Sequence, residues 1–477
     1  MSLNKNTAGQ DLEIPELHHS GKTVPHGTDS VPRANNRPRQ IVDAARKVFT
    51  RHPYTSASIR MIEKEGDFDH SLIRYYFKGK QGLFEAVMED LLSGFLDDLL
   101  RTLMEMTHVP AERALEPFID HFFDHAFRNP ELMEVMILNT GEKDIYKSTL
   151  FRLWELQQAI RENFKALARK VGVKAEDSEI TTWLFAFSMC AGNYIGARNF
   201  HARILGMDAD SEAYRNWAGA TMKSVFGPAW KEMLDSRKKP ARRIDPFRER
   251  KHNAGPRNPL ELERGRGRYI RERKGEITRR KVLAAASRVF STRPYDAASL
   301  RVIGKEGGFD FTTIRYYYPS KAELFDQVCQ SLHNEYRYAV ESFFSGLEDM
   351  GMWEGLSAYL DRVLSFSFRN PGAPGVLMQI APQFHRLRDE VDIRHIEEFH
   401  KDTLRAMTRN IPIQAPDEKS RMWEYSLAVM IYNFVGASAY PAAMLGLDPG
   451  SRKYKQWIKD CLMFIFYPGL KQLVYNS

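Results

Sequence analysis

Apolar residues recur at intervals of three and four positions along most of this 477-residue chain. The clearest runs are Leu83–Met104, Leu115–Phe127, Ile180–Leu205, Leu324–Phe344 and Met422–Leu445. This spacing places apolar side chains on one face of an α-helix, and no alternating pattern typical of a strand competes with it. The pattern predicts an all-α protein.

The pattern occurs twice. The 44 residues that begin at Ile41 align without a gap to the 44 that begin at Val282, an offset of 241, and 22 pairs are identical. Shorter matches continue downstream at an offset of 241 and then 240: Phe127–Pro130 with Phe368–Pro371, Trp183 with Trp423, Asn193–Ala197 with Asn433–Ala437, and Trp217 with Trp457. The repeated piece is about 200 residues long, the size of a domain. The chain therefore carries two copies of one unit, called here the first unit and the second unit.

Each 44-residue block has the spacing of three short helices. In the first unit a helix over Ile41–Arg51 precedes a second over Ile59–Glu65, which Ser58 can cap by accepting a backbone N–H bond. Gly66-Asp67 makes a tight turn, and Asp69 can cap a third helix that ends near Tyr76. Two short helices joined by such a turn predict a helix-turn-helix, whose second helix can enter the major groove of DNA.

The charge of the chain is unevenly distributed. The net charge is +8, yet residues 37–84 and 278–325 each carry +5 and residues 236–277 carry +9, which leaves −11 on the rest. Concentrated basic charge on an acidic body is typical of a polyanion-binding surface. Charge alone leaves an ordinary solvated surface as an alternative.

Composition and repeat together predict six segments. They are an N-terminal arm rich in loop-forming residues (1–36), a helix-turn-helix domain (37–84), a helical ligand-binding and dimerisation domain (85–235), a basic linker (236–277), a second helix-turn-helix domain (278–325) and a second helical domain (326–477). The positive charge of the linker would either add non-specific phosphate contacts or only keep a tether solvated.

The first block resembles the DNA-binding domain of the TetR (tetracycline-repressor) family. The resemblance rests on A-A-x-x-V-F, S-[IL]-R-x-I, G-x-F-D and [IL]-R-Y-Y-[FY]-x-x-K-x-x-L-F, which both copies contain. It implies base-facing positions at His70, Ser71, Leu72 and Arg74, and at Phe311, Thr312, Thr313 and Arg315. It implies phosphate contacts by Ser58, Tyr75 and Lys80, and by Ser299, Tyr316 and Lys321. One departure is Asp67, where the family usually has the turn glycine that the second copy keeps as Gly308.

The resemblance also implies pairing through the last two long helices of each unit. These would span about 179–204 and 211–234, and about 419–444 and 451–470, with Asn193 and Asn433 either bonded across the bundle or satisfied within their own helices. We expect one chain to form an intramolecular pseudo-dimer, because a flexible 42-residue linker has an r.m.s. span of roughly 35 Å. The base-facing triplet is His-Ser-Leu in the first unit and Phe-Thr-Thr in the second. Because the two triplets differ, we expect an operator with two different half-sites.

Large apolar side chains crowd the helices after each DNA-binding block. Most of them form the core, and the resemblance implies that some line a pocket for an apolar or amphipathic effector. The residues expected to line it are Phe122, Met136, Trp154, Trp183, Phe187, Met378, Phe384, Trp423 and Met430. Binding would change the spacing of the two DNA-binding domains.

Other classes of protein find less support in the sequence. No phosphate-binding glycine loop, paired-histidine metal motif or nucleophile elbow is present, so we expect no enzyme, no metal and no cofactor. His121 and His125 are spaced for a metal, but the second unit has Arg362 and Phe366 there. No apolar run is long enough for a membrane span, and three scattered cysteines fit a cytoplasmic protein. A ligand-sensing or partner-binding module that has lost DNA binding remains the alternative.

Overall fold

The computed structural model describes residues 37–141, 150–235, 274–414 and 417–475. Every regular element in these ranges is a helix, which confirms the all-α prediction. The predicted arm and residues 236–273 of the predicted linker lie outside the described part. Within the described ranges, no helix has the length and apolar character that a membrane span requires.

The first unit contains ten α-helices among its described residues. They are α1 (Arg37–Phe49), α2 (Ile59–Gly66), α3 (Ser71–Phe77), α4 (Lys80–Glu105), α5 (Ala111–Arg128), α6 (Glu131–Asn139), α7 (Leu150–Lys170), α8 (Asp177–Gly196), α9 (Arg198–Leu205) and α10 (Glu212–Leu234), with the 3-10 turn η2 (Met106–His108) after α4.

The second unit follows the same order with extra short turns. Its helices are α11 (Lys274–Phe290), α12 (Leu300–Gly307), α13 (Phe311–Tyr317), α14 (Lys321–Phe344), α15 (Met352–Arg369), α16 (Gly372–Ile380), α17 (Phe384–Leu387), α18 (Arg394–Asn410), α19 (Asp417–Gly436), α20 (Ala439–Met444) and α21 (Arg452–Tyr475), and its 3-10 turns are η5 (Tyr295–Ala297) and η6 (Ala381–Gln383). Helix α11 begins four residues before the predicted boundary at 278.

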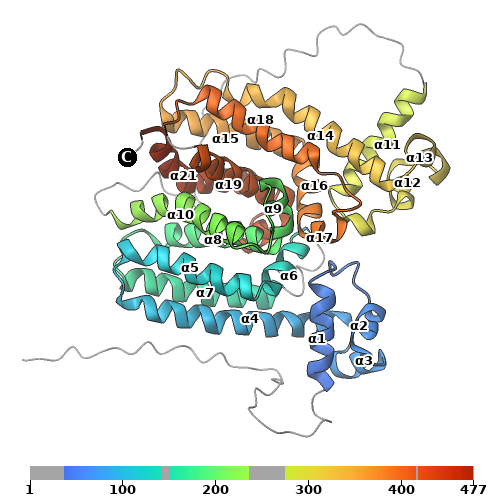
Figure 1. The fold of residues 1–477 in the computed structure, drawn as a ribbon, viewed down its shortest axis with the longest axis horizontal. Coiled ribbons are helices and arrows are strands. Elements are labelled where there is room, and N and C mark those ends of the chain that lie inside the picture. Colours follow the sequence, from blue (N-terminus) through green and yellow to red (C-terminus); the bar gives the residue numbers. More distant parts are fainter. Residues whose placement is uncertain (1–36, 142–149, 236–273, 415–416, 476–477) are drawn as a thin grey trace, which may run out of the picture.

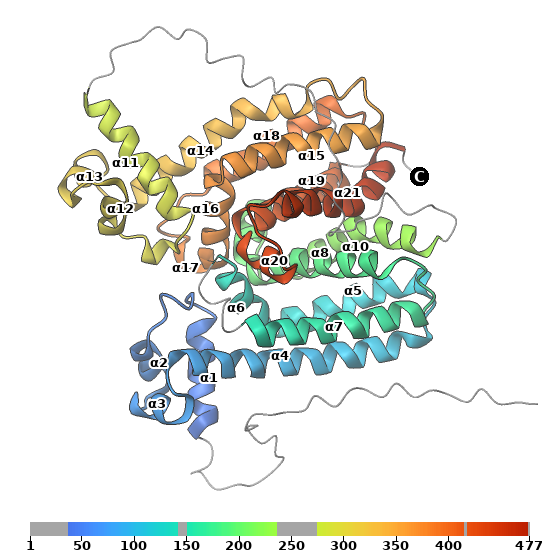
Figure 2. The ribbon, with the colours of Figure 1, turned by 180° about the vertical axis from the view of Figure 1, so that it is seen from behind.

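The main contact between the two units is a bundle of four helices. Helices α8 and α10 lie against α19 and α21, in the middle of the molecule (Figures 1 and 2). Outside this bundle, α1–α3 form the first head and α11–α13 form the second head. Both heads lie on the same side of the molecule, at the ends of the long helices α4 and α14 (Figure 1).

The units hold their bundle helices together by matching buried bonds. The indole Nε1 of Trp183 donates to the Phe226 carbonyl at 3.2 Å, and Trp423 donates to the Phe466 carbonyl at 3.0 Å. Each bond ties the start of the penultimate long helix to the last one. Because a buried N–H without an acceptor is costly, these tryptophans fix the register of α8 on α10 and of α19 on α21.

The continuous helices expected over about 179–204 and 419–444 are each divided in two. The break in the first unit lies at Ala197 (φ −114°, ψ 27°). Just before it, Gly196 packs so closely on α6 that a Cβ there would lie 2.4 Å from the Met133 carbonyl oxygen, and a Cβ at Gly436 would lie 2.3 Å from that of Pro374. The apolar periodicity continues through both breaks, so the expectation of one long helix was wrong for a reason of tertiary packing.

Among the described residues, three fully buried side-chain hydrogen bonds cross between the units inside the bundle. Asn193 Nδ2 donates to Asn433 Oδ1 at 2.7 Å, so of the two arrangements expected for this pair, the cross-bundle bond is present. Each asparagine also donates to a carbonyl in its own helix, at Met189 or Val429. The other two bonds join the Tyr194 and Ser426 hydroxyls at 2.8 Å, and His201 Nδ1 and Tyr425 Oη at 2.8 Å.

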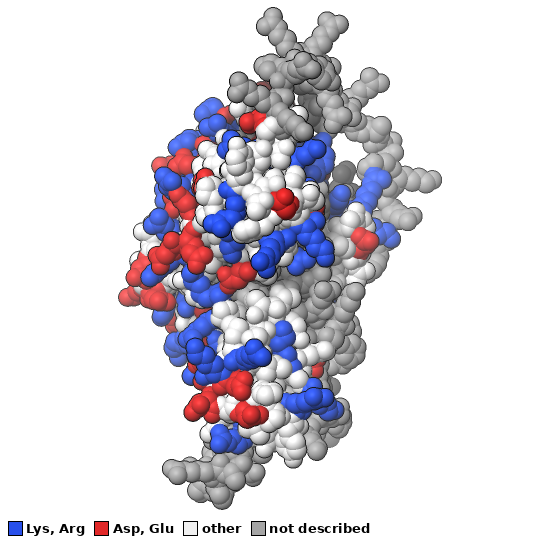
Figure 3. Space-filling view, turned by 90° about the vertical axis from the view of Figure 1, so that its right-hand side faces the viewer, with Lys and Arg blue, Asp and Glu red and all other residues white. Residues whose placement is uncertain are grey.

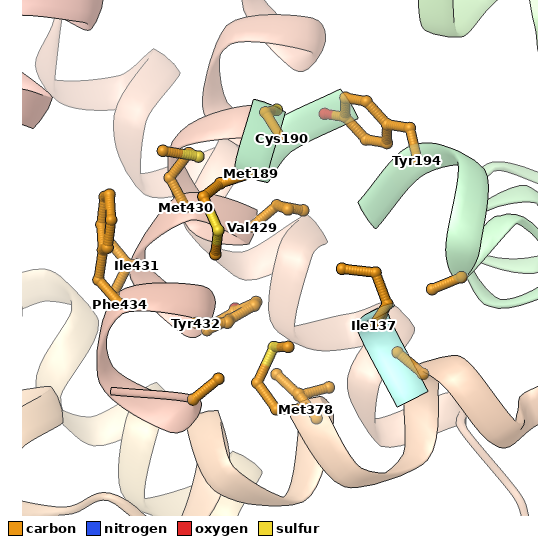
Figure 4. Packing of buried hydrophobic residues seen from close by; sticks show 14 of the residues in the cluster. Ile137, Met189, Cys190, Tyr194, Met378, Val429, Met430, Ile431, Tyr432 and Phe434 are labelled. Carbon is orange, nitrogen blue, oxygen red and sulfur yellow. The ribbon is translucent and has the colours of Figure 1, made fainter. Parts of the chain in front are cut away.

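The core runs through both units without interruption. Figure 4 shows side chains of α6, α8, α16 and α19 gathered in one cluster, among them Ile137, Met189, Met378 and Met430. These residues come from both units and belong to a single buried cluster. The contact between the units is therefore continuous with the interior of each.

Candidate nucleic-acid interface and ligand cavities

The first head is a helix-turn-helix. Ser58 caps α2, because its hydroxyl oxygen accepts from the Met61 N–H at 3.2 Å, as the sequence predicts. Helix α2 ends at Gly66, and the next residue, Asp67, adopts the left-handed conformation (φ 50°, ψ 55°) and donates its N–H to the Glu63 carbonyl. Gly66 leaves no room for a side chain, since a Cβ would lie 2.0 Å from the Phe68 ring. This turn sets the angle at which α3 leaves α2.

The second head has the same turn with a different residue at its left-handed position. Ser299 caps α12 by accepting from the Val302 N–H, and Gly308 takes the left-handed conformation with φ 73°. Asp310 then caps α13 by accepting from the Thr313 N–H at 2.6 Å and the Thr312 hydroxyl at 2.6 Å. These bonds, that of Thr312 first, lower the pKa of Asp310. In the first head the equivalent Asp69 accepts from the Ser71 N–H at 2.7 Å.

The residues expected to face bases lie at the exposed starts of α3 and α13. His70, Ser71 and Arg74 are exposed and Leu72 is half-buried, while Ile73 points into the core of the head. In the second head Phe311, Thr312 and Arg315 are exposed and Thr313 is half-buried. The Arg315 guanidinium lies 5.5 Å from the centre of the Phe311 ring, a cation–π distance.

The tyrosines expected to bind phosphate extend into solvent. Tyr75 is 79% exposed and Tyr316 is 83% exposed, and each packs edge-to-face on the tyrosine that follows it. Tyrosines this exposed do not belong to the core of the head, and their hydroxyl groups can donate to a phosphate oxygen. Both tyrosines are placed on their heads in the same way.

The two lysines expected to bind phosphate are held inside their own heads. Lys80 Nζ donates to the carbonyls of Tyr54 and Ala57 at 2.8 and 2.9 Å, and Lys321 Nζ donates to that of Tyr295 at 3.1 Å. Burial lowers the pKa of Lys321. Each ammonium ties the start of a long helix to the loop before the helix-turn-helix, so a phosphate contact by either lysine stays a prediction.

One arginine joins the two heads. Arg386, on α17 of the second unit, donates to Asp296 Oδ2 of the second head at 2.7 Å and lies 2.9 Å from His52 Nδ1 of the first head. Burial and then the Arg386 charge lower the pKa of His52, so a neutral imidazole that accepts the bond is favoured. Sequence periodicity offers no signal for this contact, because it joins three segments that meet only in the folded molecule.

Figure 3 looks onto the side that carries both heads. Lysine and arginine side chains lie there in several separate groups, with acidic and uncharged surface between them. Basic charge is thus distributed over two exposed heads, in keeping with two sites of contact for a polyanion rather than one continuous stripe.

A cavity of about 410 Å³ lies in the first unit. Of the residues expected in a pocket, Phe122, Met136 and Phe187 line it. Four lining residues come from α20, the turn after it and α21 of the second unit: Tyr440, Met444, Leu445 and Trp457. The second unit thus closes the pocket of the first, which no pattern within one copy could reveal.

A smaller cavity of about 250 Å³ lies in the second unit. It is found at the other end of the helical domain, beside the last turns of α14 and α21, and Trp423 is the one expected pocket residue in its lining. Glu424, next to it in the sequence, also lines the cavity although it is 4% exposed. The sequence carries a signal for Glu424, since it is the one charged residue between Met422 and Leu447.

Four residues expected in a pocket line neither cavity. Trp183 is fully buried between Phe187 and Trp230, and Met430 is fully buried in the bundle. Met378 packs beneath Gly436, and Phe384 meets Phe200 of the other unit edge-to-face. All four are core or inter-unit contacts, because apolar core and apolar lining look the same in a sequence. Trp154 lies outside the residues whose side chains the structure describes.

Two groups of side chains have ligand types that suit a metal. His121 and His125 of α5 both face Asp98 of α4, with His125 Nδ1 at 2.7 Å and His121 Nε2 at 3.7 Å from one carboxylate oxygen. In the described ranges, Glu63, Asp69 and His70 are brought within 4.8 Å of one another at the surface of the first head. The carboxylates of both groups already have protein partners, at His125 and the Ser71 N–H.

Comparison with known proteins places the heads in one family. The model of the N-terminal domain of "Bacterial regulatory proteins, tetR family" matches residues 41–87 and again 282–328. The HTH-type transcriptional regulator BetI of Escherichia coli strain UMN026 is 32% identical over 120 residues, and that of strain E2348/69 is 28% identical. The match covers 25% of this chain and 61% of each relative, so the chain spans about three fifths of the length of the curated relatives it matches.

A solved structure from Mesorhizobium loti MAFF303099, of a protein assigned to the TetR family of transcriptional regulators, is also similar. It shares 20% identity, with a TM-score of 0.28 over 40% of this chain and 98% of that protein. The two heads with their helical bodies define a helix-turn-helix protein. The TetR-family model matches this chain twice, once on each head, so the chain carries two DNA-binding domains of the TetR type.

Proposed function

We propose that this protein is a transcriptional repressor that binds a double-stranded DNA operator through both heads and is released by a small apolar or amphipathic ligand. The observation that carries the proposal is the duplicated helix-turn-helix with its second helix exposed, on the same side of one body. An exposed recognition helix that begins with polar side chains and a basic residue fits the major groove. The relatives named as transcriptional regulators support this reading.

The operator has two different half-sites in this proposal. His70, Ser71 and Leu72 offer an imidazole, a hydroxyl and an apolar group, whereas Phe311, Thr312 and Thr313 offer a ring and two hydroxyls. These side chains differ in hydrogen-bonding capacity and in bulk, so they favour different base edges. The arginine and tyrosines that follow are identical in both heads and would contact similar positions.

One chain supplies both halves of the pseudo-dimer. The support comes from asymmetric polar contacts: each joins a residue of the first unit to one of the second, and the equivalent positions in the opposite sense cannot form the same bond. Tyr194 bonds to Ser426 across the bundle, but the equivalent residues, Phe434 and Ala186, have no hydroxyl groups. Two first units would place the Tyr194 hydroxyl against Ala186, and a buried hydroxyl without a partner costs about 1–3 kcal/mol.

A second contact has the same one-sided character. His201 bonds to Tyr425, whereas the equivalent residues in the other direction are Pro441 and Phe185. Pairing of unlike units satisfies both polar pairs, and pairing of like units leaves groups of each pair unmatched. Size-exclusion chromatography with light scattering tests this: we expect the mass of one chain, 55.2 kDa, and a strict two-chain dimer at all concentrations would contradict it.

DNA binding is tested with the recognition arginines. An operator is first selected from randomised duplexes by the full chain. We expect Arg74→Ala and Arg315→Ala each to weaken binding by about tenfold or more, since one good base contact contributes about 1–3 kcal/mol of discrimination. Each variant should relax sequence preference in one half-site only.

Arg113→Ala is the matched control, because Arg113 is exposed on α5 of the body, away from the heads. It should leave affinity and preference unchanged. If neither recognition variant changes duplex binding while circular dichroism shows intact helices, the ligand-sensing module without DNA binding is the better description.

A further inference from the structure

The cavity of the second unit contains an isolated acidic group. Glu424 lines it, yet the side chain is 96% buried, since only 4% of the residue is exposed. No described residue donates a hydrogen bond to its Oε1. The nearest basic group is His400, whose Nδ1 lies 3.9 Å from Oε1, beyond hydrogen-bond distance, and is itself without a hydrogen-bond partner among the described residues.

The rest of the lining cannot neutralise this carboxylate. The described residues around the cavity include no lysine, arginine or histidine. Thr403 is the nearest hydroxyl on α18, but it already bonds to the Tyr336 hydroxyl at 2.7 Å and to the Phe399 carbonyl at 3.0 Å. A buried carboxylate oxygen without a hydrogen-bond donor is costly, and the one basic group beside it, His400, lies too far away to donate, so the site can accept a hydrogen bond from a cationic donor.

The remaining walls are apolar and aromatic. Phe344, Leu356, Tyr359, Trp423 and Leu470 surround the space, and Glu348 lies at its exposed mouth. The volume of about 250 Å³ is below the roughly 300–1,000 Å³ that is usual for ligand sites, which favours a small molecule. Aromatic rings beside a carboxylate stabilise an organic cation both by cation–π attraction and by charge. A metal ion would need several oxygen ligands, and the cavity interior supplies one carboxylate.

We propose that this cavity binds a small organic cation, whose ammonium N–H donates to Glu424 and whose apolar body fills the space between the aromatic walls. The proposal names the ligand class of the second unit and therefore rests on the ligand-binding part of the proposed function. It sets the two units apart, because the position of Glu424 is occupied by Leu184 in the lining of the larger cavity of the first unit.

The test uses the full chain without DNA and three probes of similar length: octylammonium, 1-octanol and octanoate. Calorimetric titration should show octylammonium binding at least tenfold more tightly than 1-octanol, with octanoate weakest. Glu424→Gln keeps the size of the side chain and removes its charge. It should remove the preference, so that octylammonium loses tenfold or more in affinity while 1-octanol changes by less than about twofold.

Glu418→Gln is the matched control, since it makes the same exchange at an exposed position of α19 outside the cavity lining, and it should leave all three affinities unchanged. Leu470→Trp, which fills the cavity, should abolish octylammonium binding. Equal affinity of the ammonium and the alcohol, or an unchanged preference in Glu424→Gln, would overturn the proposal. Binding is measured on free protein, so a chain that binds octylammonium through Glu424 but releases no operator would contradict the proposed function and leave this inference standing.

Discussion

The two units share a backbone plan and differ in where their interiors are hollow. Matching bonds hold both: Trp183 to Phe226 and Trp423 to Phe466, and likewise Tyr214 to the Tyr194 carbonyl and Tyr454 to the Phe434 carbonyl, both at 2.7 Å. Yet the cavity of the first unit lies against α6 and the second unit, whereas that of the second unit lies at the far end of its own bundle.

Exchanges between large and small side chains explain this shift. Gly192 and Phe95 line the first cavity, and the second unit has the buried tyrosines Tyr432 and Tyr336 at these positions. At the other end, Trp230 fills the first unit where Leu470 lines the second cavity. The two copies thus share the hydrogen bonds that hold their helices together, while the cavity between the helices lies at a different place in each.

The largest expected effect comes from reversing one of these exchanges. Trp230→Leu should destabilise the chain by about 3 kcal/mol, because it opens a cavity and leaves the Ala111 carbonyl without its indole donor at 3.0 Å. Urea unfolding followed by circular dichroism measures the loss. The converse change, Leu470→Trp, adds bulk where space exists and should cost less than about 1 kcal/mol. Equal losses for the two variants would mean that the cavities do not reflect these exchanges.

The next largest effect is the loss of stability at acid pH, to which a buried histidine of the first unit contributes and the equivalent position of the second unit does not. Burial, and then His400, lower the pKa of His201 to about 3, whereas the equivalent position holds Pro441. An unfolded histidine titrates near 6.5, so between pH 6.5 and 3 the unfolded chain binds a proton that the folded chain does not, and stability falls as the pH falls. From pH 7 to pH 5 this one group should cost about 2 kcal/mol.

His201→Gln isolates that contribution, since glutamine can still bond to the Tyr425 hydroxyl and does not titrate. The free energy of unfolding, measured at pH 7 and at pH 5, should fall less in the variant than in the unaltered chain. The difference between the two falls should be about the 2 kcal/mol expected for His201. His385, whose pKa burial lowers to about 4, titrates in both proteins and cancels in the comparison. If the variant had the same pH dependence as the unaltered chain, folding would not lower the pKa of His201.

The sequence predicted the features that depend on neighbouring residues. The helical class and the cap at Ser58 follow from spacing and side-chain chemistry, and the structure confirms both, with the equivalent Ser299 capping α12 in the same way. The break at Ala197 could not be predicted, because it arises where Gly196 meets the carbonyl of another helix. The cavity linings were only partly accessible, since Trp183 and Phe187 have equal apolar character and adjacent helical turns but different neighbours in space.

The smallest expected effect compares the turns of the two heads. Asp67 (φ 50°) and Gly308 (φ 73°) both occupy the left-handed conformation, which glycine adopts freely and other residues adopt at a cost. Asp67→Gly should therefore stabilise the first head by about 0.5 kcal/mol, less than the full backbone term because glycine also gains freedom when unfolded. Gly308→Asp should destabilise the second head by up to about 1 kcal/mol. Hydrogen exchange of the amides in α3 and α13 reads each head separately, and Asp67→Asn, which removes the charge and keeps the backbone preference, should change neither. If Asp67→Asn matched Asp67→Gly, the charge of Asp67 and not its backbone conformation would distinguish the two turns.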